Sequence, residues 1–342
     1  MDNTHVDNTS TTLCRNHNID LIKIFAMIGV VELHCPSVFA GREFDFVGQF
    51  YRFFVVSIPL FFMVSGYLLL GRKNINLRYS MKKIRGIIRF VAIVASAYWL
   101  FDVVSDKATL SLNSYLRYLI DPYIGQGEFG TFWFFTALIF LYALYPITNR
   151  LFPKGHMTCG GVWLIAAMII LQQCVFFGVL IWPAEGHVME YPFILWSPWN
   201  WILYFCLGAA VKTRRLDFLG HPLAVVILFA LNVYMQLRLL PYINNWRLEY
   251  FYTAIPTIAL TAGVFIFIEK LQIRNTKLIS AVSSTFLMVY LIHRIVIACV
   301  FEIFPILGPV TPILFWITAT ICCIASALVL IKIPGVSQVV KI

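Results

Sequence analysis

The sequence predicts an all-α polytopic membrane protein with about ten transmembrane helices, and three observations predict it. Hydrophobic residues make up 60% of the 342 residues and charged residues only 12%, about half the charged share of a soluble protein. Apolar segments of about 20 residues, the length that crosses a bilayer, recur along the chain. Lys and Arg gather in alternate connecting segments. This composition excludes a cytosolic enzyme, a secreted disulfide-rich domain and a disordered chain.

Ten segments have the length and apolar composition of a transmembrane helix. They are 19–39, 53–70, 88–104, 131–148, 161–181, 198–211, 222–240, 253–269, 283–304 and 311–332. The sixth is short and rich in Trp, so the sequence defines its bounds less sharply than those of the other segments. We expect 1–18 to be a polar cytoplasmic N-terminal tail, 19–332 to be the transmembrane domain, and 333–342 to be a short cytoplasmic C-terminal tail.

The positive residues fix the expected orientation. With the N-terminus inside, nineteen of the 26 Lys and Arg residues fall on the inner side and six on the outer side, while Arg294 lies within a segment. The positive-inside rule therefore places both termini in the cytoplasm. The same bias accounts for the net charge of +10 without a nucleic-acid partner. The eight Cys form no CxxC pair and no metal-ligand spacing, so we expect small buried hydrophobes and no metal.

The first segment, 19–39, carries three ionisable residues, which are costly in hydrocarbon and therefore candidates for function. Lys23 and His34 are eleven residues apart, so both project from one face of a helix, about 16 Å apart along its axis. Glu32 points to a different side. Alternatively, Lys23 is an anchor that reaches the membrane surface and His34 is a satisfied buried polar residue.

The second segment and the loop after it carry the next signals. Ser65-Gly66 is a small-residue patch that admits another backbone or a thin ligand. Seven positive residues follow within eighteen positions, and such a cluster is suited to grip phosphates. The simpler alternatives for the cluster are the positive-inside rule itself and the binding of anionic lipid headgroups. Its members are Arg72, Lys73, Arg78, Lys82, Lys83, Arg85 and Arg89.

Two later segments complete the pattern. Trp133-Phe134 opens the fourth segment, although Trp at this depth is usually an interfacial anchor. In the ninth segment His293 and Arg294 lie near the middle of the membrane, where a charged pair is costly if it faces lipid. Tyr290 precedes His293 by about one turn on the same face.

Taken in order, these segments resemble the acyltransferase 3 family of integral membrane acyltransferases. Lys23 and His34 look like its Arg/Lys-x10-His motif, and Phe61-Phe62-Met63-Val64-Ser65-Gly66 looks like its FFxxSG element. The basic stretch at 82–89, Trp133-Phe134 and Tyr290-Leu291-Ile292-His293 are similar to its later landmarks. The resemblance covers roughly 15–332. Two positions depart from it: Lys23 replaces the commoner Arg, and Thr131 stands where members often carry His.

The resemblance implies transfer of an acyl group, usually acetyl from cytoplasmic acetyl-CoA, at the bacterial inner membrane. The acceptor would be a hydroxyl of a cell-surface glycan, such as lipopolysaccharide O-antigen, or of its lipid-linked precursor. A sugar hydroxyl is a weak nucleophile, and a positioned His is the usual base that activates it. The expected catalytic residues are His34, Glu32 and His293; those for the donor are Lys23, Ser65, Gly66, Lys82, Lys83, Arg85 and Arg89; those for the acceptor are Trp133, Tyr290 and Arg294.

Two other functions fit part of the sequence. A transporter or flippase of a polyprenyl-linked sugar would suit ten spans and intramembrane charges. The chain shows neither paired halves nor the matched broken helices that transporters often have. A sensor of anionic lipid would use the basic loop, but it leaves His34 and His293 without a role.

Overall fold

The computed structural model describes residues 15–35, 53–72, 77–124, 129–181, 198–239, 248–273, 276–303 and 311–340. Within these residues all regular structure is helical and no strand occurs. The all-α class predicted from composition is therefore confirmed for the described part of the chain.

Six described helices are long and apolar enough to cross a membrane. They are α5 (Leu77–Val104), α7 (Trp133–Thr148, continued by a 3₁₀ turn to Leu151), α8 (Cys159–Ile181), α11 (Pro222–Leu239), α14 (Phe286–Ile303) and α15 (Thr311–Leu330). Four apolar helices are shorter: α1 (His17–Leu33), α4 (Ser57–Leu69), α10 (Pro198–Ala210) and α12 (Ile255–Glu269). Each of the ten predicted segments thus contains one helix. The number of ten crossings and the cytoplasmic position of both termini remain predictions.

Shorter elements join these helices. They are the 3₁₀ turns η1 (Phe54–Val56), η3 (Asn149–Leu151), η4 (Pro153–Gly155), η5 (Val211–Thr213), η6 (Asp217–Gly220) and η8 (Leu248–Thr253), and the helices α6 (Leu112–Ile124), α13 (Lys277–Ser283) and α16 (Pro334–Val340). None of the three helices was predicted, since each is too short or too polar to satisfy a rule based on apolar length.

Two predicted bounds differ from the structure. The third segment was expected to begin at 88, whereas α5 begins at Leu77. Lys and Arg are good helix formers, so the basic residues extend the helix beyond its apolar part. The ninth segment was expected to be continuous from 283, but α13 ends at Ser283 and α14 begins at Phe286.

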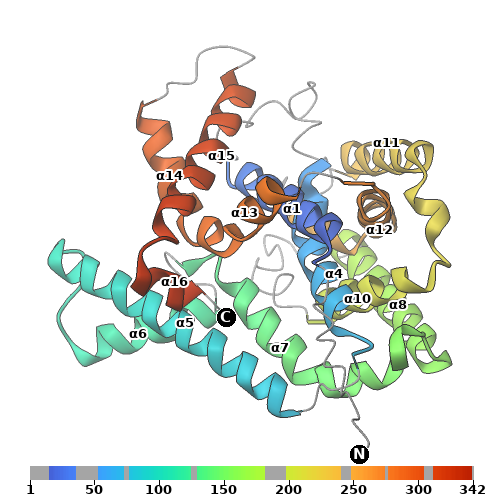
Figure 1. The fold of residues 1–342 in the computed structure, drawn as a ribbon, viewed down its shortest axis with the longest axis horizontal. Coiled ribbons are helices and arrows are strands. Elements are labelled where there is room, and N and C mark those ends of the chain that lie inside the picture. Colours follow the sequence, from blue (N-terminus) through green and yellow to red (C-terminus); the bar gives the residue numbers. More distant parts are fainter. Residues whose placement is uncertain are drawn as a thin grey trace, which may run out of the picture.

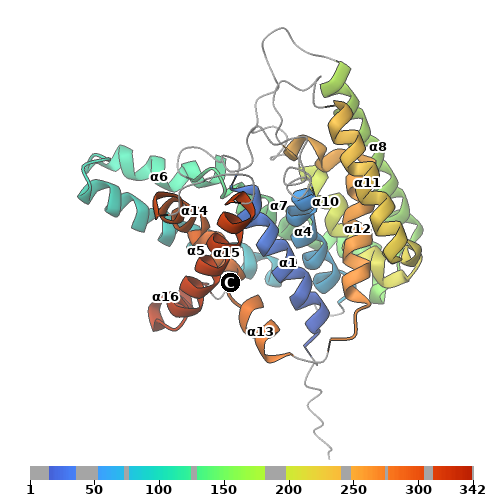
Figure 2. The same ribbon diagram turned by 90° about the horizontal axis from the view of Figure 1, so that it is seen from above.

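Helix α1 lies at the centre of the molecule beside α4, as Figures 1 and 2 both show. It also packs against α12 on one side and against α13, α14 and α15 on the other. Helices α8 and α11 stand beyond α12, while α5, α6 and α7 form the opposite flank (Figure 1). The residues along α1 therefore face both halves of the bundle.

Helices α4 and α10 cross at two glycines. A Cβ placed on Gly66 would lie 1.7 Å from the carbonyl oxygen of Phe205, and one on Gly208 would lie 1.9 Å from that of Met63. Such distances are shorter than any van der Waals contact, so only glycine allows the two backbones to approach this closely. The small-residue patch predicted at Ser65-Gly66 does admit another backbone, and Gly66 is the residue that admits it.

Polar contacts around Glu269 join three elements at one end of the bundle. Arg214 donates to both of its carboxylate oxygens at 2.7 and 3.0 Å, and the hydroxyl of Tyr67 donates to one of them at 3.1 Å. These hydrogen bonds from Arg214 raise the pKa of its guanidinium above the ordinary value. Asn18 donates to the backbone carbonyl of Glu269 at 2.6 Å. The start of α1 is therefore held to the ends of α4 and α12.

Candidate active site

A cavity of about 490 Å³ opens beside the first turns of α1. Helices α4, α5, α7, α13 and α14 complete its wall. Its lining contains three residues predicted to bind the acyl donor, namely Lys23, Ser65 and Lys83. The cavity thus brings together side chains from the first and second predicted segments and from the basic stretch before the third. The lining residues used below are Arg15, Lys23, Phe61, Ser65, Arg72, Lys83, Phe134, Phe135, Ser283 and Phe286.

Positive charge concentrates at one end of this cavity, where Arg15, Lys23, Arg72 and Lys83 all line the wall. Hydroxyl groups lie beside them, on Ser65 and on the pair Ser283-Ser284 of α13 and its cap. Cations with adjacent hydroxyls are the groups that hold a phosphate through charge-assisted hydrogen bonds. This end of the cavity is therefore suited to a phosphorylated ligand.

Asp20 organises that charged end from behind the wall, with 3% of its surface exposed. The Nε of Arg15 donates to its carboxylate, and the hydroxyl of Ser283 donates to it at 2.9 Å. The Nζ of Lys23 lies 3.7 Å from the same carboxylate. Asp20 therefore fixes two of the cations of the cavity. Our sequence analysis gave it no role, although a carboxylate three residues before Lys23 in an apolar segment was a usable signal.

Aromatic rings close the other end of the cavity. Phe61 lies 5.2 Å from Phe286 and 6.1 Å from Phe134, measured between ring centroids. Phe134 and Phe135 in turn lie 5.3 and 5.5 Å from the ring of Tyr290. A charged ligand head and an apolar ligand arm would therefore meet different surfaces within one cavity.

Two histidines meet beyond these rings. His34 caps the end of α1 and His293 lies in α14, with ring centroids 4.6 Å apart and planes inclined by 48°. Tyr290 stands between this pair and the cavity, since its ring is 5.8 Å from that of His293. The two residues were predicted from separate segments, and the structure brings them together.

The hydrogen bonds of His293 define its tautomer. Its Nδ1 lies 2.7 Å from the carbonyl oxygen of Tyr290. Because a carbonyl oxygen only accepts, Nδ1 carries the hydrogen and Nε2 holds the lone pair. The ring is 1% exposed, and Nε2 has no hydrogen-bond partner among the described residues. His293 thus presents an available proton acceptor next to His34.

Tyr290 is itself held by a hydrogen bond to another segment. Its hydroxyl donates to the backbone carbonyl of Thr131, just before α7. The position at which the family often carries His therefore contributes a main-chain acceptor here, and the side chain of Thr131 is not required for this contact.

The remaining predicted residues lie away from the cavity. Glu32 is 1% exposed, and its carboxylate oxygens have no hydrogen-bond partner within the described residues. Trp133 is buried and stacks on Trp201 at 5.1 Å. Gly66 faces α10, as described above. Arg294 is exposed and follows His293 directly.

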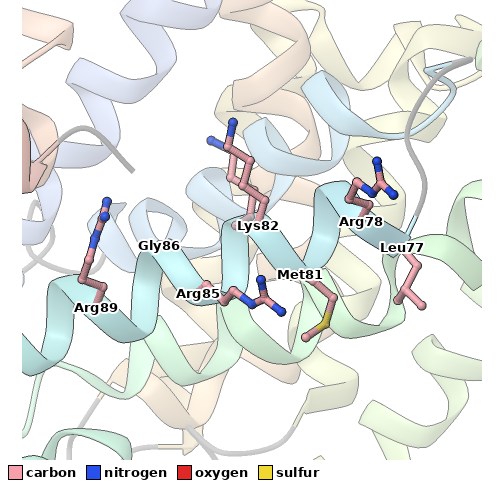
Figure 3. Close-up of a pocket in the computed structure, with 8 residues that line it drawn as sticks. Leu77, Arg78, Met81, Lys82, Arg85, Gly86 and Arg89 are labelled. Carbon is pink, nitrogen blue, oxygen red and sulfur yellow. The ribbon is translucent and has the colours of Figure 1, made fainter.

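The predicted basic cluster divides between two surfaces. Lys83 lines both the cavity and a neighbouring groove of about 750 Å³ along α5, whereas Lys82, Arg85 and Arg89 line the groove and not the cavity. Figure 3 shows these side chains projecting from the first turns of α5. The sequence predicted one phosphate-binding cluster, but the structure places only one of these four residues in the cavity wall. Arg72, another member of the predicted seven-residue cluster, also lines the cavity, as does Arg15, which was not predicted there.

Comparison with known proteins gives one family over most of the chain. The profile of a family described as an acyltransferase domain matches residues 16–332. A curated protein named as an amino-acid racemase of Enterococcus faecalis is 32% identical over 130 residues, which are 36% of this chain and 18% of that protein. The match thus spans less than a fifth of that relative. No solved structure matches.

Proposed function

Because this chain belongs to the acyltransferase 3 family over residues 16–332 and is a multi-pass membrane acyltransferase, we propose that it moves an acetyl group from cytoplasmic acetyl-CoA to a hydroxyl of a cell-surface glycan. The proposed acceptor is lipopolysaccharide O-antigen or its lipid-linked precursor, and the proposed location is the bacterial inner membrane.

The observation that carries this proposal is the alignment of two sites along α1. The cationic end of the cavity lies beside Lys23, and His34 meets His293 about three turns further along the same helix. Tyr290 lies between the cavity and the histidine pair. A donor with a charged head and a long acyl-bearing arm suits such a site, because its two ends need different surroundings.

The donor's phosphates would bind at the charged end. Lys23 and Lys83, together with Arg15 and Arg72, supply the cations, and Ser65 supplies a hydroxyl. The cytoplasmic side follows from the distribution of Lys and Arg, which places the start of α1 inside. The arm would then extend toward Phe134 and Tyr290, so that the thioester approaches the histidine pair.

The histidine pair would supply the base. As the base accepts the proton of the sugar hydroxyl, the sugar oxygen forms a bond to the thioester carbonyl carbon. The tetrahedral intermediate then breaks its carbon–sulfur bond, and the thiolate of CoA leaves and takes up the proton. We assign the base to His34, while Nε2 of His293 orients it or shares the proton. Arg294, which follows His293 in the sequence, would stabilise the negative charge that develops on the thioester carbonyl oxygen.

Glu32, Trp133 and Gly66 support this site from outside the cavity. Glu32 places a buried carboxyl group in the last turn of α1, two residues before His34, which caps the helix. Trp133 packs the aromatic layer through Trp201. Gly66 keeps α4 close to α10 and so fixes the position of Ser65 on the cavity side.

The test follows labelled acetyl-CoA in membranes that contain either the wild-type protein or His34→Ala. Label should enter the lipid-extractable and polysaccharide fractions only with the wild-type protein, while both proteins are present in the membrane at equal levels. Equal labelling by the wild type, His34→Ala and an empty membrane would contradict the proposal. Transport of lipid-linked sugars would then be the next function to measure.

A further inference from the structure

The groove along α5 is a second cationic surface, distinct from the cavity. Arg78, Lys82, Arg85 and Arg89 all line it, and all four are exposed. They are separated by four, three and four residues, so at about 100° per residue they project within about 60° of one another. Lys83 is rotated about 100° from Lys82 around the helix and lines both the groove and the cavity. The four cations therefore form a continuous stripe along one face of the helix, about 16 Å long.

Within the described part of the chain, the charges of this stripe form no ion pair with a carboxylate. No ion pair found among the described residues includes Arg78, Lys82, Arg85 or Arg89. Like charges three and four residues apart on a helix repel one another. An anion bound along the groove would reduce this repulsion. The stripe therefore favours the binding of a negatively charged ligand.

The lining between the cations is apolar. Besides the four cations of the stripe and Lys83, the groove is lined by Leu77, Met81 and Gly86. The described lining thus contains neither a hydroxyl nor an aromatic ring, in contrast to the cavity, which has serines, tyrosines and phenylalanines. A nucleotide-bearing donor needs a surface for its base and sugar, whereas a lipid needs only cations for its phosphate and an apolar surface for its chains.

The position of the groove also fits a lipid. Helix α5 has 28 residues, about 42 Å at 1.5 Å per residue, which exceeds the hydrocarbon thickness of about 30 Å. The cations occupy its first turns, where the helix enters the membrane, and the later turns expose apolar side chains such as Ile93 and Leu100. Clusters of Lys and Arg at this position are typical binding sites of anionic lipid headgroups.

We infer that Lys82, Arg85 and Arg89, together with Arg78, bind the phosphodiester headgroup of an anionic phospholipid along the outer flank of α5. Arg85 and Arg89 donate paired hydrogen bonds to phosphate oxygens, which a guanidinium matches in geometry. Leu77 and Met81 contact the glycerol and the first carbons of the acyl chains. This site adjoins the donor cavity at Lys83, but its four cations do not line that cavity, and its occupation does not require acyl transfer.

The experiment measures bound lipid on the full-length protein. The protein is incorporated into bilayer discs of phosphatidylcholine and phosphatidylglycerol in equal parts, released into mild detergent, and weighed by native mass spectrometry. The wild type should retain phosphatidylglycerol in preference to phosphatidylcholine. The triple variant Lys82→Gln/Arg85→Gln/Arg89→Gln should lower that preference by roughly tenfold or more.

A matched control removes the same charge elsewhere. Arg150→Gln/Lys154→Gln/Arg215→Gln changes three exposed cations outside the groove and should retain phosphatidylglycerol as the wild type does. Equal retention by both triple variants would overturn the inference. So would displacement of phosphatidylglycerol from the wild type by added coenzyme A, because the groove would then belong to the donor. Neither result bears on whether the protein transfers acetyl groups, which the labelling experiment tests separately.

Discussion

The ring of His293 lies 4.6 Å from the ring of His34, and its Nε2 has no hydrogen-bond partner among the described residues. One histidine ends α1 and the other lies in the middle of α14, so the contact depends on how these two helices pack. Both rings therefore lie in contact, although they belong to segments that are far apart in the sequence.

Replacing either histidine should remove most of the activity. We expect His34→Ala and His293→Ala each to lower the rate of acetyl transfer by about 10²–10⁴-fold, the range for loss of a general base or its partner. Because the residues act as a unit, the double variant should be scarcely slower than the worse single variant. Initial rates with labelled acetyl-CoA, normalised to protein in the membrane, measure this. Independent, multiplying effects would show that the rings do not work together.

Lys83 and Lys82 are neighbours in sequence, and both line the groove along α5, but only Lys83 also lines the cavity, which makes them a matched pair. Lys83→Gln should raise KM for acetyl-CoA by about tenfold, the effect of losing one charged hydrogen bond, with kcat little changed. Lys82→Gln should raise KM by less. Steady-state kinetics on purified membranes distinguish them. A larger effect at Lys82 would move the donor site to the α5 groove.

Asp20→Asn should loosen the charged end of the cavity. The variant removes the charge that holds Arg15 and Lys23, and we expect a loss of about 1–3 kcal/mol in stability together with a raised KM for the donor. Thermal unfolding in detergent measures the first effect. Asp217→Asn is the control, because its ion pair with Lys270 is partly exposed on both sides and contributes at most about 1 kcal/mol. Equal destabilisation by both variants would argue against the role of Asp20.

Substitutions at Gly66 and at Ser65 should distinguish an effect on helix packing from an effect on ligand binding. In Gly66→Ala the new methyl would overlap the carbonyl of Phe205, so α4 and α10 must move apart, and we expect a lower melting temperature and little folded protein. Ser65→Ala should fold normally, because the Ser65 hydroxyl bonds only to the carbonyl of Phe61 in its own helix among the described contacts. Its effect should appear in the kinetics. Normal folding of Gly66→Ala would disprove the close crossing.

The sequence was sufficient where a single helix decides the geometry. The spacing of Lys23 and His34 predicted one face, and the structure gives that face a cavity at one end and a histidine contact at the other. Spacing also held the information that Lys83 points away from Lys82, Arg85 and Arg89. We grouped the four by charge alone and therefore predicted one cluster.

The sequence was insufficient where two helices decide the geometry. Nothing in the order of residues predicts that His293 lies beside His34, or that the Tyr290 hydroxyl donates to the backbone carbonyl of Thr131. The hydrogen bond from Ser283 of α13 to Asp20 is a contact of the same kind, whereas the contacts of Asp20 with Arg15 and Lys23 are local in sequence and were overlooked. Short helices such as α13 and α6 lie below the length at which apolar composition gives a signal.

The aromatic layer between the cavity and the histidine pair has a consequence for the membrane as an electrical insulator. Phe134, Phe135 and Tyr290 pack against one another where a passage from the cavity toward the histidines would run. Their rings offer no hydrogen-bonded path for a file of water. On the route proposed above for the acyl group, these packed rings would therefore keep acyl transfer from opening a path for protons across the bilayer.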